Sequence, residues 1–106
     1  RVAKAAKSLG IDAPWLVPCD ANSNESLDAV FAKWQQDEAT LDFVVHSIAF
    51  ADKDYLKPDM FHKPPREVYL GAIDTSAYSL IAMTERAMPL MTNGGAIIKM
   101  SYYGGE

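Results

Sequence analysis

Two adjacent tyrosines, Tyr102 and Tyr103, follow the apolar run that begins at Ala96, and their phenol groups are the best candidates for chemistry. If the run is a strand, a phenol at its carboxyl end can project its hydroxyl into a ligand cleft. There it can donate a hydrogen bond to a developing oxyanion. Side chains alternate along a strand, so only one of the two tyrosines can face a given side. On spacing alone, a tyrosine at a protein interface explains the pattern equally well.

Asp20 and His46 are further candidates, because ligands of parallel α/β sheets bind beyond the carboxyl ends of the strands. Asp20 follows an apolar run over residues 15–19, where a carboxylate more often caps a turn than contacts a ligand. His46 ends the run over residues 41–46, and we expect a buried, hydrogen-bonded core histidine rather than a catalytic one. The same rule selects three stretches for a site, namely residues 20–21, 46–51 and 101–105.

Helices should alternate with these runs. One is predicted over residues 1–9, with Gly10 able to end it. A second should begin near Asn22, which has capping-box spacing with Glu25. Apolar residues then recur at the spacing of one helical stripe, namely Leu27, Val30, Phe31 and Trp34.

A third helix is predicted from residue 65 or 66 to residue 88, after a loop over residues 47–65. Between Val68 and Thr84 its only charged residue is Asp74. A helix that lies on one sheet should present a polar outer face to water. We therefore expect this helix to be covered on both sides.

Strands are predicted over residues 15–19, 41–46 and 96–102. Pro18 counts against the first of them, because proline cannot donate to a strand ladder. Strands that alternate with helices favour parallel pairing through right-handed crossovers. The pattern thus predicts an α/β fold with a parallel sheet.

Composition limits the class of protein. The 106 residues fit one domain, and 49% hydrophobic with 23% charged residues is typical of a globular chain rather than a disordered one. The net charge is −4 and the basic residues are scattered, so no nucleic-acid partner is expected. No charge-free stretch approaches the roughly 20 apolar residues of a membrane span. A single cysteine favours a reducing, cytoplasmic setting.

Three blocks of sequence carry a family resemblance: LDFVVHSIAFA over residues 41–51, DTSAYS over residues 74–79 and MSYYGGE over residues 100–106. In this order and spacing, the chain resembles the NADH-dependent enoyl-acyl-carrier-protein reductases of bacterial type II fatty-acid synthesis. These enzymes belong to the short-chain dehydrogenase/reductase superfamily. The run VPCD over residues 17–20 also looks like the family's third strand.

The resemblance implies a cofactor site for NAD. Asp20 would accept a hydrogen bond from the adenine amino group, and Ala21, where the family more often has valine, would contact adenine through its backbone. The ribose and pyrophosphate side of the cofactor would be wrapped by small residues that permit close approach, namely Ser47, Ile48 and Ala49. No metal site is implied.

The resemblance also implies a substrate site for an enoyl thioester carried on acyl carrier protein. Phe50, Ala51 and Leu56 would border the enoyl pocket. Tyr102 matches the first active-site tyrosine of the family and would face the thioester, while Tyr103 would point away. The family reduces a trans-2-enoyl chain with hydride from NADH and assembles as a homotetramer, here through the helix over residues 66–88.

We expect the chain to be the central segment of one NAD-binding Rossmann domain, because both ends look cut through secondary structure. It would keep strands 3, 4 and 5 of a doubly wound parallel sheet and lack strands 1 and 2, so a gap or a re-pairing of strands is expected. The family's Gly-rich turn, Tyr-x6-Lys pair and substrate-covering helix are not in the sequence. We therefore expect no catalysis by this segment alone.

Two other functions stay open. Another short-chain reductase acting on a ketone or alcohol is one, although such enzymes carry an Asn-Asn-Ala-Gly-type turn where this chain has residues 46–49, HSIA. A non-catalytic α/β nucleotide-binding or assembly module is the other. A Tyr-x6-Lys motif further along the gene would favour the enzyme.

Overall fold

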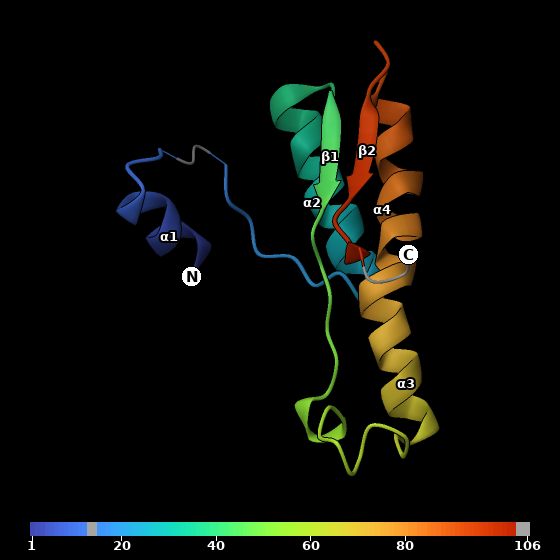
Figure 1. The fold of residues 1–106 in the computed structure, drawn as a ribbon. Helices are drawn as coiled ribbons and strands as arrows, with labels where there is room; N and C mark the ends of the chain where they lie inside the picture. The colour runs from blue at the N-terminus through green and yellow to red at the C-terminus, as the bar shows by residue number, and fades with distance from the viewer. Residues whose placement is uncertain (13–14, 104–106) are drawn as a thin grey trace.

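The two strands of the fold lie side by side with helices packed behind them (Figure 1). The computed structural model describes residues 1–12 and 15–103. The α-helices and strands are, in chain order, α1 (Val2–Ser8), α2 (Asn24–Glu38), β1 (Phe43–His46), α3 (Arg66–Ile73), α4 (Ser79–Ala87) and β2 (Ala96–Lys99). Three short helical turns join them, namely η1 (Lys53–Tyr55), η2 (Asp74–Tyr78) and η3 (Met88–Leu90).

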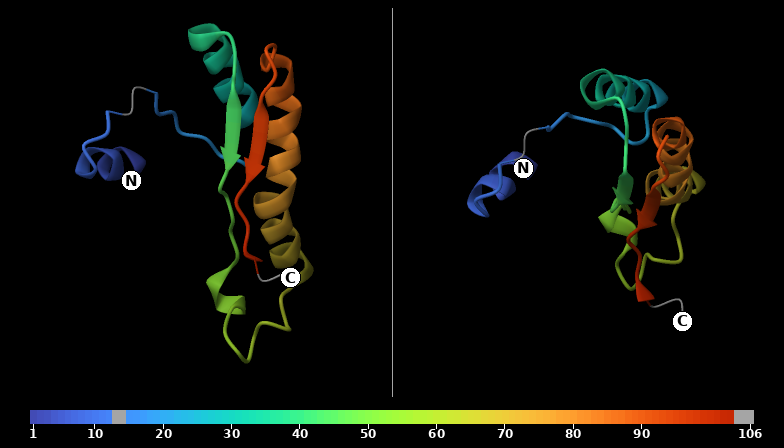
Figure 2. Two further views of the ribbon diagram at one scale, coloured as in Figure 1. Left: turned by 45° about the horizontal axis from the view of Figure 1, so that its top comes forward. Right: turned by 90° about the horizontal axis from the view of Figure 1, so that it is seen from above.

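The sheet is parallel, as predicted. Phe43 pairs with Ala96 and His46 pairs with Lys99, so both strands end at the same edge. The chain crosses from β1 to β2 through α3 and α4, and Figure 2 shows these helices and α2 on one side of the sheet. Inner side chains such as His46 face these helices, while Phe43 and Val45 on the open face are exposed.

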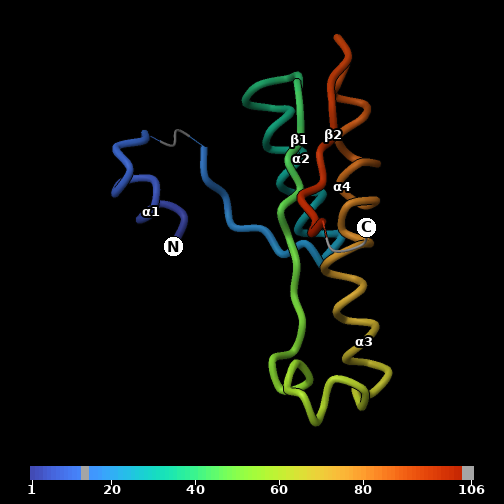
Figure 3. The backbone as a smooth tube through the Cα atoms, viewed as in Figure 1, coloured from blue at the N-terminus to red at the C-terminus, as the bar shows by residue number. Residues whose placement is uncertain are grey.

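The predicted strand over residues 15–19 is wrong for this structure, because none of these described residues forms strand pairs. The tube in Figure 3 shows this segment running apart from β1 on its way to α2. Trp15 instead packs edge-on against Trp34, with ring centroids 5.2 Å apart, and its indole N–H donates to Asp37 Oδ2 at 2.9 Å. A strand needs a hydrogen-bonding neighbour, and the segment meets a helix side instead.

The start of α2 lies one residue from where the sequence placed it. Ser23, not Asn22, is the N-cap, and its hydroxyl oxygen accepts the Ser26 N–H at 3.1 Å. Asn22 is thereby free of the capping role, and its side-chain oxygen accepts the Thr75 hydroxyl at 2.8 Å. This contact joins the turn before α2 to the long helix.

The long helix predicted over residues 66–88 is confirmed as one continuous path of α3, η2 and α4. η2 is a π-helical turn, wider than the α-helix on either side of it. Ser79, Ala82 and Ala87 are buried, and Ser79 contacts His46 of the sheet. The outer face carries large apolar side chains that are 44–65% exposed, namely Tyr69, Leu70, Ile73, Tyr78 and Ile81.

A glycine is needed where the chain enters β2. A Cβ at Gly95 would overlap the carbonyl oxygen of Asp42, which accepts the Ala96 N–H at 3.3 Å. We expect Gly95→Ala to lower the free energy of unfolding by about 1–3 kcal/mol, since the backbone must move to remove the overlap. Urea denaturation measures this change.

Gly71→Ala in α3 is the matched control, because a Cβ there meets no atom within 4 Å. It should raise the free energy of unfolding by about 0.5–1 kcal/mol through the helix preference for alanine. A Gly95→Ala protein as stable as the Gly71→Ala protein would show that this close approach does not hold the strand.

Candidate functional site

The candidate site is an open pocket of about 480 Å³ at the carboxyl ends of β1 and β2. Its walls come from the residues after β1, from η2 and from the end of β2. The lining residues are Ser47, Ile48, Ala49, Ser76, Lys99, Met100, Ser101 and Tyr102. This is the edge where parallel α/β sheets bind ligands.

A buried histidine lies beneath this pocket. His46 is 0% exposed, and its Nε2 lies 2.7 Å from the hydroxyl oxygen of Ser79, which is also buried. The Ser79 hydroxyl donates onward to the Thr75 carbonyl oxygen at 2.6 Å. The expectation of a hydrogen-bonded core histidine is thus confirmed.

Lys99 fixes the protonation of that histidine. Its ammonium nitrogen lies 2.9 Å from His46 Nδ1, and an ammonium can only donate, so Nδ1 must be unprotonated. The proton of the neutral ring therefore sits on Nε2 and is donated to Ser79. Burial lowers the pKa of His46 below its ordinary value of 6.5, and the charge on Lys99 lowers that pKa further.

The π-turn η2 holds both segments expected to bind the cofactor. The Ser76 hydroxyl accepts the Phe50 N–H at 3.0 Å and donates to the Phe50 carbonyl oxygen at 3.2 Å. Thr75 holds Asn22, whose N–H is also bonded to Asp20 Oδ1 at 3.0 Å. Neighbouring residues of one turn therefore anchor the chain after β1 and the turn before α2.

The structure brings together part of the site expected from the sequence. Ser47, Ile48, Ala49 and Tyr102 line one pocket, and Tyr103 is not among the lining residues.

Asp20 and Ala21 lie outside this lining, and Asp20 is exposed on the turn that Asn22 joins to η2. The three expected substrate residues also lie outside it: Phe50 and Leu56 are 61% and 66% exposed, and Ala51 is exposed as well. The loop with η1 extends beyond the strand ends to the start of α3 (Figure 1).

Three residues of the site were not expected from the sequence, namely Ser76, Ser79 and Lys99. Lys99 gave one signal, since it is a charged residue within an otherwise apolar strand. The two serines lie in the DTSAYS block that carries the family resemblance, but small polar residues on a helix are compatible with almost any role.

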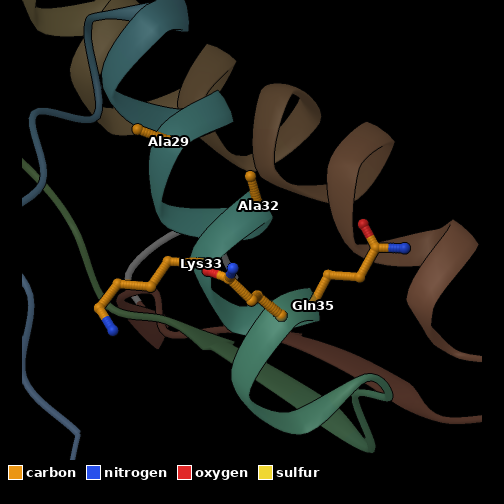
Figure 4. Close-up of a pocket in the computed structure, with 5 residues that line it drawn as sticks. Ala29, Ala32, Lys33 and Gln35 are labelled. Carbon is orange, nitrogen blue, oxygen red and sulfur yellow. The ribbon is translucent and has the colours of Figure 1, made fainter.

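A second hollow lies on the exposed side of α2 (Figure 4). Ala29, Ala32 and Gln35 line it with Lys33, and their side chains point in different directions. The Lys33 ammonium is bonded to Asp37 at 2.7 Å. With no polar groups converging on one point, this hollow lacks the features of a ligand site.

The chain matches known proteins along its whole length. A family model described as Enoyl-(Acyl carrier protein) reductase matches residues 1–106. The enoyl-acyl-carrier-protein reductase (NADH) FabI of Bacillus cereus is 41% identical over 86% of this chain and 35% of its own length. The protein of the same name from Aquifex aeolicus is 39% identical over 100% of this chain and 38% of its own length.

The solved structures agree. An enoyl-acyl-carrier-protein reductase from Anaplasma phagocytophilum in complex with NAD superimposes with a TM-score of 0.86 at 41% identity. The superposition covers 99% of this chain and 39% of that protein. The chain thus spans little more than a third of the length of the proteins it matches.

The lowered pKa of His46 predicts how stability depends on pH. Below pH 6.5 the histidine of the unfolded chain takes up a proton more readily than the buried ring does. The contribution of His46 to the free energy of unfolding should therefore be at its maximum above pH 6.5. It should decrease as the pH falls from 6.5 toward the lower pKa of the folded protein. One proton gives a slope of about 1.4 kcal/mol per pH unit at most.

His46→Gln should remove this part of the slope, as urea denaturation between pH 5 and 7.5 would show. His62→Gln is the control, because His62 is exposed to water in the folded protein. If the free energy of unfolding depends on pH equally in the wild type and in His46→Gln, the claim that the buried His46 ring is neutral would be contradicted.

Proposed function

The chain belongs to the enoyl-(acyl carrier protein) reductase family, and we propose that it is the central segment of an NADH-dependent member. The complete protein would reduce trans-2-enoyl-acyl-carrier-protein to acyl-acyl-carrier-protein with NADH in fatty-acid elongation. One observation carries the proposal: residues 47–49 and Tyr102, from two of the sequence blocks that carry the family resemblance, line one pocket at the strand ends. In the proposed Rossmann domain, β1 and β2 are strands 4 and 5.

The described residues fit a dinucleotide. NADH, when bound, supplies the hydride that reduces the enoyl double bond. Ser47, Ile48 and Ala49 line an open pocket wall without bulky polar side chains, which suits close backbone contact with the ribose and pyrophosphate. The carboxylate of Asp20 is exposed on a turn held by Asn22, so it can accept the adenine amino group, with Ala21 beside it.

Tyr102 is the proposed catalytic residue of this segment. Its side chain is 98% exposed at the pocket, so its hydroxyl is available to the substrate. It would donate a hydrogen bond to the thioester oxygen as negative charge develops there. Phe50, Ala51 and Leu56, on the loop after β1, would border the enoyl chain.

The long helix is the proposed subunit interface of a homotetramer. Its outer face exposes several large apolar side chains, among them Tyr69, Ile73 and Ile81 at 59%, 44% and 65%. Exposed apolar side chains gathered on one face are typical of a protein interface. We place the complete protein in the cytoplasm, in keeping with a single exposed cysteine. Of the helices within the described residues, none has the length and apolar character of a membrane span.

The test of function uses the complete gene product. NADH oxidation with a trans-2-enoyl thioester should be observed, and Tyr102→Phe should lower kcat about 10- to 100-fold. That loss corresponds to the roughly 1.5–3 kcal/mol of a hydrogen bond to a charged group. The dissociation constant for NADH should change little, because the hydroxyl would address the substrate.

Tyr103→Phe is the matched control and should retain the wild-type kcat. A larger loss from Tyr103→Phe would mean that Tyr103, and not Tyr102, faces the substrate beyond the end of β2. Reduction of a ketone instead of an enoyl thioester would favour another short-chain reductase, and NADH binding without turnover would favour a nucleotide-binding module.

The interface is tested by Tyr78→Arg, which places a charge on the outer helix face where Tyr78 is 44% exposed. Burying an unpaired charge between subunits is unfavourable, so sedimentation should show smaller species with an unchanged circular dichroism spectrum. Gln36→Arg on the exposed side of α2 is the control and should leave the assembly intact. An unaltered tetramer in Tyr78→Arg, or a monomeric wild type at micromolar concentration, would contradict this interface.

A further inference from the structure

The ammonium group of Lys99 joins three elements at the floor of the pocket. Its nitrogen lies 2.9 Å from His46 Nδ1, 3.0 Å from the Ile48 carbonyl oxygen and 3.0 Å from the Ser76 carbonyl oxygen. These acceptors belong to β1, to the chain just after it and to η2. An ammonium has three N–H donors, so these three bonds use all of them.

The acceptors of Lys99 are neutral. The ion pairs found within the described residues are Lys33 with Asp37 and Arg86 with Asp28, neither of which involves Lys99. Hydrogen bonds from a half-buried ammonium to carbonyl oxygens and a ring nitrogen restrict the positions of those acceptor atoms, because each bond depends on direction as well as distance. Moving residue 48 away would leave the charge with an unpaired donor in a partly buried place.

We propose that Lys99 is a positioning residue that holds residues 47–49 against the π-turn η2 and so sets the shape of the cofactor side of the pocket. Only the identity of the ligand, NADH, rests on the proposed function. The positioning role of Lys99 does not depend on it. Lys99 lines the pocket, but its donors are already occupied, so its effect on the ligand passes through the Ile48 carbonyl.

The rest of the structure supports this role. Lys99 lies directly opposite His46 in the strand register, which places the two side chains on the inner face together. Two residues beyond Ile48, the backbone of Phe50 is bonded twice to the Ser76 side chain. The chain after β1 is thus held to Ser76 at two points. Lys99 links the Ile48 carbonyl oxygen to the Ser76 carbonyl oxygen, and the Ser76 hydroxyl is bonded directly to the backbone of Phe50.

The experiment compares Lys99→Met with Lys33→Met in the complete protein. Both remove an ammonium from a side chain of similar length, but Lys33 lies on the outer side of α2, away from the pocket. Lys99→Met should raise the dissociation constant for NADH at least 10-fold and change kcat at saturating NADH less than 3-fold. Lys33→Met should change neither.

Two further measurements need no ligand. Amide hydrogen exchange at Phe50 should speed up at least 10-fold in Lys99→Met and stay unchanged in Lys33→Met. Nitrogen chemical shifts of the His46 ring should show protonated Nε2 and bare Nδ1 in the wild type, and a histidine that protonates at higher pH in Lys99→Met. Ser79 and Lys99 are the groups that contact the ring by hydrogen bonds.

The outcomes separate the two proposals. A protein that binds no NADH but shows the exchange and ring changes would contradict the proposed function and leave the positioning role standing. Unchanged exchange at Phe50 would overturn the positioning role, and so would a fall in kcat with unchanged NADH affinity. If Lys99→Met does not fold, Lys99→Gln replaces it as the test variant, because glutamine keeps two N–H donors. It should give the same changes in NADH affinity and Phe50 exchange, but smaller ones. The absence of these changes in Lys99→Gln would equally overturn the proposal.

Discussion

A buried imidazole must have both of its nitrogens bonded, and the arrangement around the site depends on how this requirement is met at His46. Leaving one nitrogen unpaired costs about 1–3 kcal/mol. Here Lys99 supplies the donor for Nδ1 and Ser79 supplies the acceptor for Nε2. Within the described residues, no buried side-chain nitrogen or oxygen lacks a partner. The two bonds of one ring therefore join β1 to β2 and to the long helix, and Lys99 extends this link to the Ile48 carbonyl oxygen in the chain after β1.

The π-turn makes these contacts possible at one level of the long helix. A π-turn holds an extra residue compared with an α-helical turn, and such turns are frequent at functional sites. In η2, the Thr75 carbonyl oxygen accepts a hydrogen bond from the Ser79 hydroxyl, and the Ser76 carbonyl oxygen accepts one from the Lys99 ammonium. The side chains of the same two residues are bonded to other segments, Thr75 to Asn22 and Ser76 to Phe50. Both segments of the proposed cofactor site thus share one rigid support, which is how separate stretches of chain keep a fixed spacing around a ligand.

The sequence predicted what depends on local pattern. The two strands that form, the amphipathic α2 and the long helix all follow from periodicity and composition. The strand over residues 15–19 did not form, because a strand also requires a neighbour that no local pattern reveals. The π-turn was missed, since it interrupts the helical spacing by one residue. The role of Lys99 could not be predicted either, because it depends on the register that places Lys99 beside His46 and on the distant carbonyls of Ile48 and Ser76.

Polar anchors, rather than apolar burial, decide which parts of this chain hold their place near the site. The buried apolar core is small, comprising Leu27, Ala82, Ala87 and Leu90, while the open sheet face leaves Val45 and Ile98 about half exposed. Residues 47–50 and 20–22 are tied to η2 by directional hydrogen bonds. Residues 16–19 have no such tie and run as irregular chain, even though their composition favours a strand. Hydrophobic contact is non-directional, so it can gather these elements, but the shape of a pocket wall requires bonds that depend on angle. The polar group at Lys99 meets that requirement at the floor of the pocket.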